Sequence, residues 1–323
     1  MKVFRASFVA CCLIGTCSFG CFGQSFPSKT VRVIVPFPPG GQSDIFARLL
    51  ASQLQPRWAV PVLVENRPGA GGIVGSEQVA HAAGDPHLLL LTATFHVINP
   101  GLYRSLPYDA RRDFTSLALV ALMPGVVLVV NPAFPARTVA DLIKLAKEAP
   151  GSIGFASTGT GGTNHLAGEL LKIMAKIDMV HVPYKGEAPA LNDVLAGHVP
   201  VMFAGLNNAM PNLVSGKLRA LAVTSLVRIP SLPSVPTLDE AGVKGFGVSS
   251  WFGLFGPARM PAAAVTRIAA DMGTLLGSEA IKTHFDKMGV EPGAMSQPEF
   301  AHYVESEMDK WSRVIEQAKI PKE

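Results

Sequence analysis

A short apolar run that ends in a loop of prolines and glycines constrains the fold of this chain more than any other stretch. Residues 31–35 read Val-Arg-Val-Ile-Val, a β-branched run that favours a strand buried on both faces. The loop at residues 36–41 closes the strand, and a helix is expected next, with Ser43 as its N-cap. Open α/β sheets bind ligands at the carboxyl ends of parallel strands, where glycines leave backbone N–H groups accessible. This loop therefore predicts an anion site.

A second unit of the same kind lies near the middle of the chain. Residues 153–156 predict a strand, and residues 157–165 read Ser-Thr-Gly-Thr-Gly-Gly-Thr-Asn-His before a second helix. The loop lacks the lysine of a nucleotide-binding P-loop, while its four hydroxyls and its backbone N–H groups suit a carboxylate. Thr163 or Asn164 is also a candidate N-cap, which gives some of these groups a structural role.

A third glycine-rich stretch, residues 68–75, invites a dinucleotide-binding interpretation that the sequence disfavours. Val74 occupies the place of the third glycine in G-x-G-x-x-G, and no acidic residue ends a strand about twenty residues later. A tight strand-to-helix turn explains these glycines equally well.

The next predicted strand, residues 88–92, is followed by Thr94 and His96. His96 either faces the same cleft as the first glycine loop or is hydrogen-bonded to the local backbone.

The N-terminal segment has the pattern of an export signal. Residues 1–23 combine a basic start, an apolar run too short to span a bilayer and small residues near the end, so we expect a signal peptide cleaved before Gln24 and a periplasmic protein. A lipoprotein signal at Cys17 or Cys21 is the alternative. All four cysteines lie in this segment, so the mature chain is expected to contain neither disulfides nor reactive thiols.

Composition and charge limit the fold and the classes of binding partner. The chain has 323 residues, of which 48% are hydrophobic and 16% charged, which suits two buried cores. Without Lys2 and Arg5, the mature chain keeps 26 of the 28 basic side chains against 24 acidic ones, so no electrostatic argument favours nucleic acid.

The order of the predicted elements indicates two α/β domains. Pro124 and Gly125 interrupt two apolar strands at a candidate crossing point, and an aromatic-rich run near residue 250 carries the chain back. We therefore expect one domain from residues 24–125 plus 250–323 and a second from residues 126–249. Each is expected to be a mostly parallel sheet flanked by helices.

At several stretches the chain resembles the Bug-type extracytoplasmic solute-binding proteins of the tripartite tricarboxylate transporters. The resemblance covers essentially the whole mature sequence and rests on six stretches in order, at residues 36–44, 64–72, 98–109, 157–165, 182–186 and 249–253. It implies a two-domain periplasmic binding protein of the Venus-flytrap kind, with a carboxylate held between the two glycine loops, partly through water. Gln42 stands where a third glycine is common in the family, so the ligand of this protein is not inferred from the ligands of its relatives.

We therefore predict a monomeric periplasmic protein that captures a small carboxylate and delivers it to the membrane permease subunits of such a transporter, with no metal, no cofactor and no enzymatic activity. Asp44 either accepts a hydrogen bond from the ligand or only favours the helix terminus. The candidate ligand-binding residues are backbone N–H donors, hydroxyls and cleft walls: Phe37, Pro39, Gly40, Gly41, Ser43, Asp44, Thr94, His96, Ser157, Thr158, Gly159, Thr160, Gly161, Thr163, His165, Tyr184, Lys185, Gly186 and Phe203.

Two other functions remain open at this stage. A periplasmic hydrolase would use Ser157 or Ser43 with His165 and an acid, but the sequence has no G-x-S-x-G elbow and no H-E-x-x-H motif. A sensing subunit that presents its ligand to a membrane receptor would share the fold and the site of the transport protein.

Overall fold

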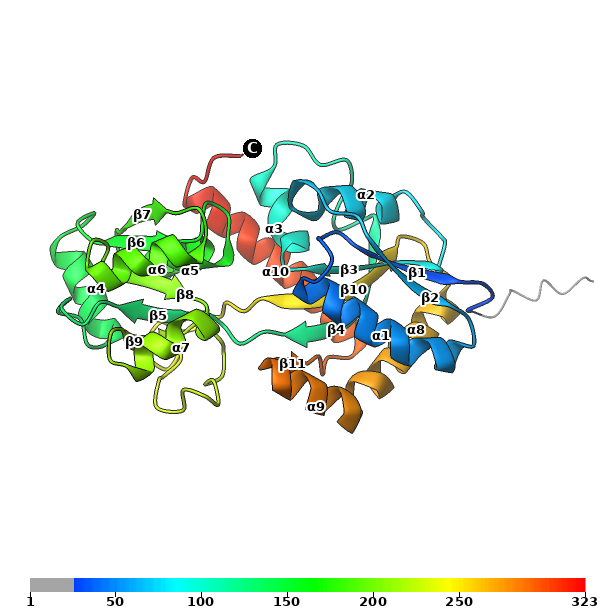
Figure 1. Cartoon of the computed structure of the whole chain (residues 1–323). Helices are drawn as coiled ribbons and strands as arrows, with labels where there is room; N and C mark the ends of the chain where they lie inside the picture. The colour runs from blue at the N-terminus through cyan, green and yellow to red at the C-terminus, as the bar shows by residue number, and fades with distance from the viewer. Residues whose placement is uncertain (1–25, 323) are drawn as a thin grey trace, which may run out of the picture.

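The computed structural model describes residues 26–322, so the predicted signal peptide and its cysteines lie outside the described residues. Figure 1 shows two lobes, each built on one sheet with helices on both faces. The first sheet has the order β11-β4-β10-β3-β1-β2, and its strands are β1 (Val31–Val35), β2 (Val62–Asn66), β3 (Leu88–Ala93), β4 (Phe114–Leu122), β10 (Trp251–Pro257) and β11 (Glu291–Pro292). The second sheet has the order β7-β6-β8-β5-β9, and its strands are β5 (Val127–Val130), β6 (Gly154–Ser157), β7 (Val180–Pro183), β8 (Val201–Ala204) and β9 (Arg219–Val223).

Helices cover both faces of each sheet. In the first lobe, α1 (Gln42–Trp58), α8 (Ala262–Leu276) and α9 (Glu279–Met288) pack on one face, and α2 (Ile73–Ala80), α3 (Phe95–Leu102) and α10 (Gln297–Gln317) pack on the other. A 3-10 turn at Ala70–Gly72 precedes α2. In the second lobe, α4 (Val139–Glu148) and α5 (Thr163–Ala175) lie opposite α6 (Glu187–Ala196) and α7 (Leu206–Val214). No helix of the described residues is long and apolar enough to cross a membrane.

The alternation within β1 explains why four of its five residues are apolar and buried, with Arg32 the exception. Val33 packs in the cluster that contains α1, whereas Ile34 packs with α2 on the opposite face, and both side chains are buried. Both faces of the strand are thus covered, as expected for a strand in the middle of an α/β sheet.

Both sheets are mixed, where we expected mostly parallel ones. β1 pairs in parallel with β2 and β3, and β6 pairs in parallel with β7 and β8. β10 runs antiparallel to β3 and β4, because the chain that returns from the second lobe enters the first sheet from the opposite end. β5 is likewise antiparallel to both of its neighbours. The predicted site lies on the loops that follow β1 and β6, the strands with parallel neighbours on both sides.

Two connections join the lobes side by side. The Met123 N–H donates to the Ser250 carbonyl oxygen at 2.8 Å, and the Thr224 hydroxyl accepts from the Val126 N–H and donates to the Val248 carbonyl oxygen. A Cβ at Gly125 would lie 2.4 Å from the Thr224 hydroxyl oxygen, which is why only glycine fits at this crossing.

The C-terminal helix also bridges the lobes. α10 packs against α3 and β4 of the first lobe and contacts α5 of the second, as Figure 1 shows. One apolar cluster consequently continues from the α3 and α10 face of the first sheet to the α4 and α5 face of the second.

The helix starts differ from the sequence prediction. The N-cap of α1 is Gly41 rather than Ser43, and the N-cap of α5 is Gly162 rather than Thr163 or Asn164. Neither helix has a side-chain cap hydrogen bond. The first N–H groups of both helices, which lack carbonyl partners within the helix, are therefore left to other acceptors.

Candidate functional site

The two glycine loops meet at a cavity between the lobes. This main cleft cavity has a volume of about 320 Å³. It is lined from the first lobe by the start of α1 and by β3 and α3, and from the second lobe by the loop before α5. Its lining residues are Phe37, Gly41, Gln42, Ser43, Ala93, Thr94, Phe95, Ile98, Gly161, Thr163, Ser250 and Phe252.

A second chamber, the side cavity, adjoins the main cleft cavity and shares Phe95 and Gly161 with it. Its volume is about 290 Å³, and it lies between α3 and the loop before α5. Its lining residues are Gly71, Phe95, Asn99, Leu102, Tyr103, Thr158, Gly159, Thr160, Gly161, Gly162 and Pro321.

The second glycine loop touches the first lobe, and both loops line the main cleft cavity. At Gly161, φ is +79°, and a Cβ there would lie 2.7 Å from the Leu102 side chain of α3, so this position requires glycine for conformation and for space. The Thr163 and Ser250 hydroxyl oxygens are 3.4 Å apart across the cleft. The two loops therefore face each other, as the sequence predicted.

In the first loop, Asp44 serves the protein rather than a ligand. Its carboxylate accepts hydrogen bonds from the Gly40 N–H at 2.9 Å, from Arg48 Nε at 3.0 Å and from Asn66 Nδ2 at 3.0 Å. The hydrogen bond from Arg48, together with the other two, lowers the pKa of Asp44 against the opposing effect of burial. The carboxylate thus fixes the loop, and it occupies the Gly40 N–H that we expected to bind the anion.

In the second loop, two histidines and a serine hold the backbone in place. The Gly159 N–H donates to Ser157 Oγ at 3.1 Å, and Ser157 Oγ is hydrogen-bonded to His181 Nε2 at 2.6 Å. The Gly161 N–H donates to His165 Nδ1 at 3.1 Å, and the His165 and His181 rings are stacked 3.7 Å apart. Of the N–H groups of the four loop glycines predicted to bind a carboxylate (Gly40, Gly41, Gly159 and Gly161), only that of Gly41 has no hydrogen-bond acceptor among the described residues.

Ten of the predicted residues line neither cleft cavity. His96 is 2% exposed and packs in the core, with its ring 4.8 Å from that of Phe114 and 4.4 Å from that of Phe255, so it does not face the cleft. Tyr184 donates to Asp193 at 2.6 Å instead of pointing to the cleft. The others outside the cavity linings are Pro39, Gly40, Asp44, Ser157, His165, Lys185, Gly186 and Phe203.

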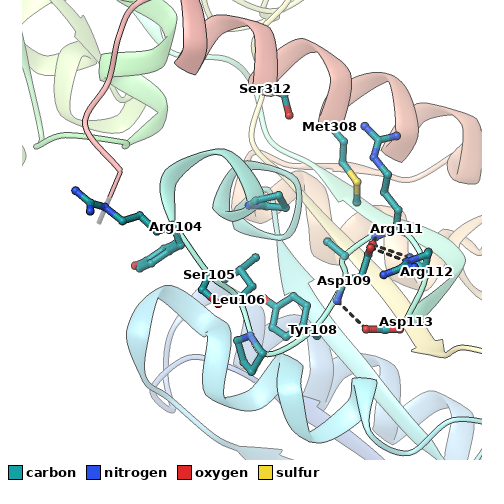
Figure 2. A pocket seen from close by; sticks show the side chains of 14 residues that line it. Arg104, Ser105, Leu106, Tyr108, Asp109, Arg111, Arg112, Asp113, Met308 and Ser312 are labelled. Atoms are coloured by element: carbon teal, nitrogen blue, oxygen red, sulfur yellow. Dashed lines mark hydrogen bonds and ion pairs between the residues drawn. The ribbon is translucent and has the colours of Figure 1, made fainter.

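A third cavity lies on the first lobe alone, between residues 103–113 and α10, and has a volume of about 590 Å³ (Figure 2). It contains three arginines, of which Arg104 donates to the Lys322 carbonyl oxygen at 3.4 Å and the other two form ion pairs. Arg111 forms ion pairs with Glu305 and Asp309 of α10, and Arg112 pairs with a carboxylate of its own loop. Since no residue of the second lobe contributes to this cavity, it does not match the cleft that the two loops form.

Comparison with known proteins identifies the family. Residues 46–320 match the model of the tripartite tricarboxylate transporter family receptor. Protein BugT of Bordetella pertussis is 33% identical over 294 residues, covering 90% of both chains.

The chain belongs to the tripartite tricarboxylate transporter receptor family. Among solved structures, Rpa4515 of R. palustris with adipate is 33% identical, with a TM-score of 0.70 over 93% of this chain and 100% of that one. MatC of Rhodopseudomonas palustris with bound malate is 32% identical, with a TM-score of 0.67 over 90% of this chain and 100% of that one. The family resemblance and the periplasmic binding protein fold inferred from the sequence are thereby confirmed.

Members of this receptor family are solute-binding proteins and not enzymes, and the structure shows why Ser157 cannot act with His165 as the hydrolase alternative requires. Ser157 has no exposed surface and is hydrogen-bonded to His181 rather than to His165. His165 in turn is occupied by the Gly161 N–H. A nucleophile without access to solvent cannot meet a substrate.

The receptor's cleft also contains residues that the sequence analysis did not select. Phe95 lines both cavities and is 40% exposed, and Ser250 and Phe252 reach the main cleft cavity from the returning connection. A signal for Phe95 existed, because Phe95, Ile98 and Leu102 follow helical spacing and mark one face of α3.

Proposed function

We propose that this receptor captures a small organic carboxylate in the main cleft cavity and delivers it to the membrane subunits of a tripartite tricarboxylate transporter. The observation that carries the proposal is the convergence of two helix N-termini, one from each lobe, on a single cavity. Gly41, Gln42 and Ser43 at the start of α1 and Thr163 at the start of α5 all line it. Because neither helix has a side-chain cap, their first N–H groups are donors suited to an anion.

The electrostatics of the cavity support an anion held by neutral groups. None of the twelve lining residues is Asp, Glu, Lys, Arg or His. The positive ends of the α1 and α5 dipoles supply the favourable potential, and preorganised backbone donors avoid the desolvation cost of a buried cation. The solved structures of two relatives contain adipate and malate, both carboxylates, in the same fold, which supports a carboxylate ligand here.

Carboxylates are expected to raise the melting temperature of the purified protein, whereas their uncharged amides are not, because only the anion complements the helix dipoles. The measurement is a thermal-shift comparison of adipate with adipamide and of benzoate with benzamide, followed by calorimetry. Equal shifts for acid and amide, or no shift with any carboxylate, would contradict the proposal.

The two lobes are proposed to act as domains, residues 24–125 plus 250–323 and residues 126–249, that close on the ligand. They are joined by two adjacent extended segments, around residues 123–126 and 248–250, and α10 packs against both lobes; the two segments permit a hinge. Small-angle scattering should give a smaller radius of gyration with saturating ligand. An unchanged radius would argue against closure.

Export to the periplasm follows from the pattern of residues 1–23 and agrees with relatives described as periplasmic. We further propose that the mature receptor is a monomer that begins at Gln24. The intact mass of protein recovered from the periplasm tests the cleavage, and a retained N-terminus or an acylated cysteine would refute it.

A further inference from the structure

The walls of the main cleft cavity are largely apolar, and this limits the body of the ligand. Phe37 and Phe95 stand together with their ring centroids 5.9 Å apart, and Phe95 keeps 40% of its surface exposed at the boundary of the two cavities. The remaining apolar lining residues are Ala93, Ile98 and Phe252. An aromatic side chain with so much exposed surface inside a ligand cleft offers a contact face that the protein itself leaves unused.

Several polar side chains of the cavity already have partners. The Thr94 hydroxyl accepts from the Trp251 N–H at 3.0 Å and lies 3.5 Å from the Trp251 carbonyl oxygen, so it is not free to bind a ligand. The Thr163 and Ser250 hydroxyls lie within hydrogen-bond distance of each other. The unoccupied donors consequently gather at the two helix starts, around Gly41 and Gln42 on α1 and at Thr163 on α5.

We propose that the preferred ligand is a monocarboxylate with an aromatic body, and that Phe95 is the residue that determines this preference. This inference rests on the proposed function. The carboxylate lies at the start of α1, facing Thr163, and the ring lies against Phe95 and Phe37. Offset or edge-to-face contact with these two rings stabilises an aromatic ligand beyond what burial of an alkyl chain of the same area provides.

The same arrangement disfavours short hydroxylated di- and tricarboxylates. A second carboxylate or a hydroxyl placed among Phe37, Phe95 and Phe252 would lose its hydration without gaining a hydrogen bond. Phe95 also separates the main cleft cavity from the more polar side cavity, where Asn99, Thr158 and Thr160 are found. Removal of the Phe95 ring would join the two chambers and give a longer ligand with two polar ends a place to lie.

Calorimetry with four ligands on the full mature protein tests the inference. Benzoate and phenylacetate are expected to bind at least tenfold more tightly than malate and citrate. Phe95→Ala is expected to weaken benzoate binding at least tenfold and to abolish its advantage over malate, while Phe95→Leu, which keeps an apolar side chain, gives an intermediate loss. The control is Val214→Ala, since Val214 is 82% exposed at the end of α7 and lines neither cavity.

The outcomes separate this inference from the function on which it rests. If malate or citrate binds as tightly as benzoate, or if Phe95→Ala and Phe95→Leu leave the benzoate-to-malate ratio unchanged, the aromatic preference is refuted while the carboxylate receptor stands. If none of the four acids and no other carboxylate binds to the folded wild-type protein, the proposed function itself fails.

Discussion

A valine in place of Gly41 is expected to abolish measurable carboxylate binding while leaving the receptor folded. Gly41 has φ −75° and ψ 167°, an extended conformation open to any residue, and a Cβ there meets only the Pro38 carbonyl oxygen, at 3.5 Å. The valine would therefore fit the backbone and stand beside the first N–H groups of α1. Since charge-assisted hydrogen bonds contribute roughly 1.5–3 kcal/mol each, losing two of them lowers affinity at least about a hundredfold.

The matched control for this prediction is Gly273→Val on α8. Gly273 is exposed, and a Cβ there has no heavy atom within 4 Å. Both variants receive a thermal melt before calorimetry, so that loss of fold is separated from loss of binding. If the Gly41→Val protein binds carboxylate with wild-type affinity, the start of α1 is not part of the ligand site.

The positions of the two glycine loops were predictable because each is a local pattern. An apolar strand, a glycine loop and a helix are contiguous in sequence in each unit, and each loop lies at the carboxyl end of a parallel strand, where open α/β sheets bind ligands. The starts of α1 and α5 shifted by only one or two residues from the predicted caps, since a glycine in extended conformation took the place of a hydroxyl side chain.

The free N–H group was not identified from the sequence, because the acceptors of the other three, although at most four residues away, are held in place by distant elements. Asp44 reaches Asn66 on β2 as well as Gly40, and Ser157 is held by His181 on β7. Which glycine is left without an acceptor depends on this packing, not on the loop sequence.

The assignment of His96 to the cleft was wrong for a related reason. Residues 95–102 form the helix α3, whereas the sequence analysis placed residues 94–99 after the carboxyl end of a strand without predicting a helix there. Consecutive residues on a helix point in directions about 100° apart, so Phe95 faces the cleft and His96 faces the core. Ser250 could not be found from the first loop at all, because it reaches the cavity on the returning connection.

Acid is expected to destabilise this protein well above the pH at which its carboxylates protonate, because the buried His96 and His165 and the half-buried His181 must stay neutral. Burial lowers the pKa of His96 to about 4, and neither of its ring nitrogens has a hydrogen-bond partner of ordinary geometry among the described residues. Burial also lowers the pKa of His165 to about 3 and that of His181 to about 4, with further lowering of both by the charge of Lys172. Glu169, which is paired with Lys172 at 3.0 Å and lies 3.7 Å from His165 Nε2, offsets part of this, because burial raises the pKa of its carboxyl group.

The direction of the effect follows from proton uptake. Below the ordinary histidine pKa of 6.5, the unfolded chain binds protons at these three positions, whereas the folded protein does not until the pH falls to about 4. The free energy of unfolding is therefore unaffected by these groups above about pH 7 and decreases as the pH falls below 6.5. Each unit of pKa difference corresponds to about 1.4 kcal/mol per group, so the combined loss by pH 4.5 is several kcal/mol, against a total stability of about 5–15 kcal/mol.

Urea unfolding between pH 8 and pH 4.5 measures this decrease, and His96→Phe isolates one of its sources. Phenylalanine preserves an aromatic ring between Phe114 and Phe255 but cannot take up a proton, so the variant should lose less stability on acidification than the wild type. The control is His284→Gln on the exposed face of α9, which should keep the wild-type slope. A stability that does not change between pH 7 and pH 5, or equal slopes for the wild type and His96→Phe, would show that these histidines accept protons in the folded state as readily as in the unfolded chain.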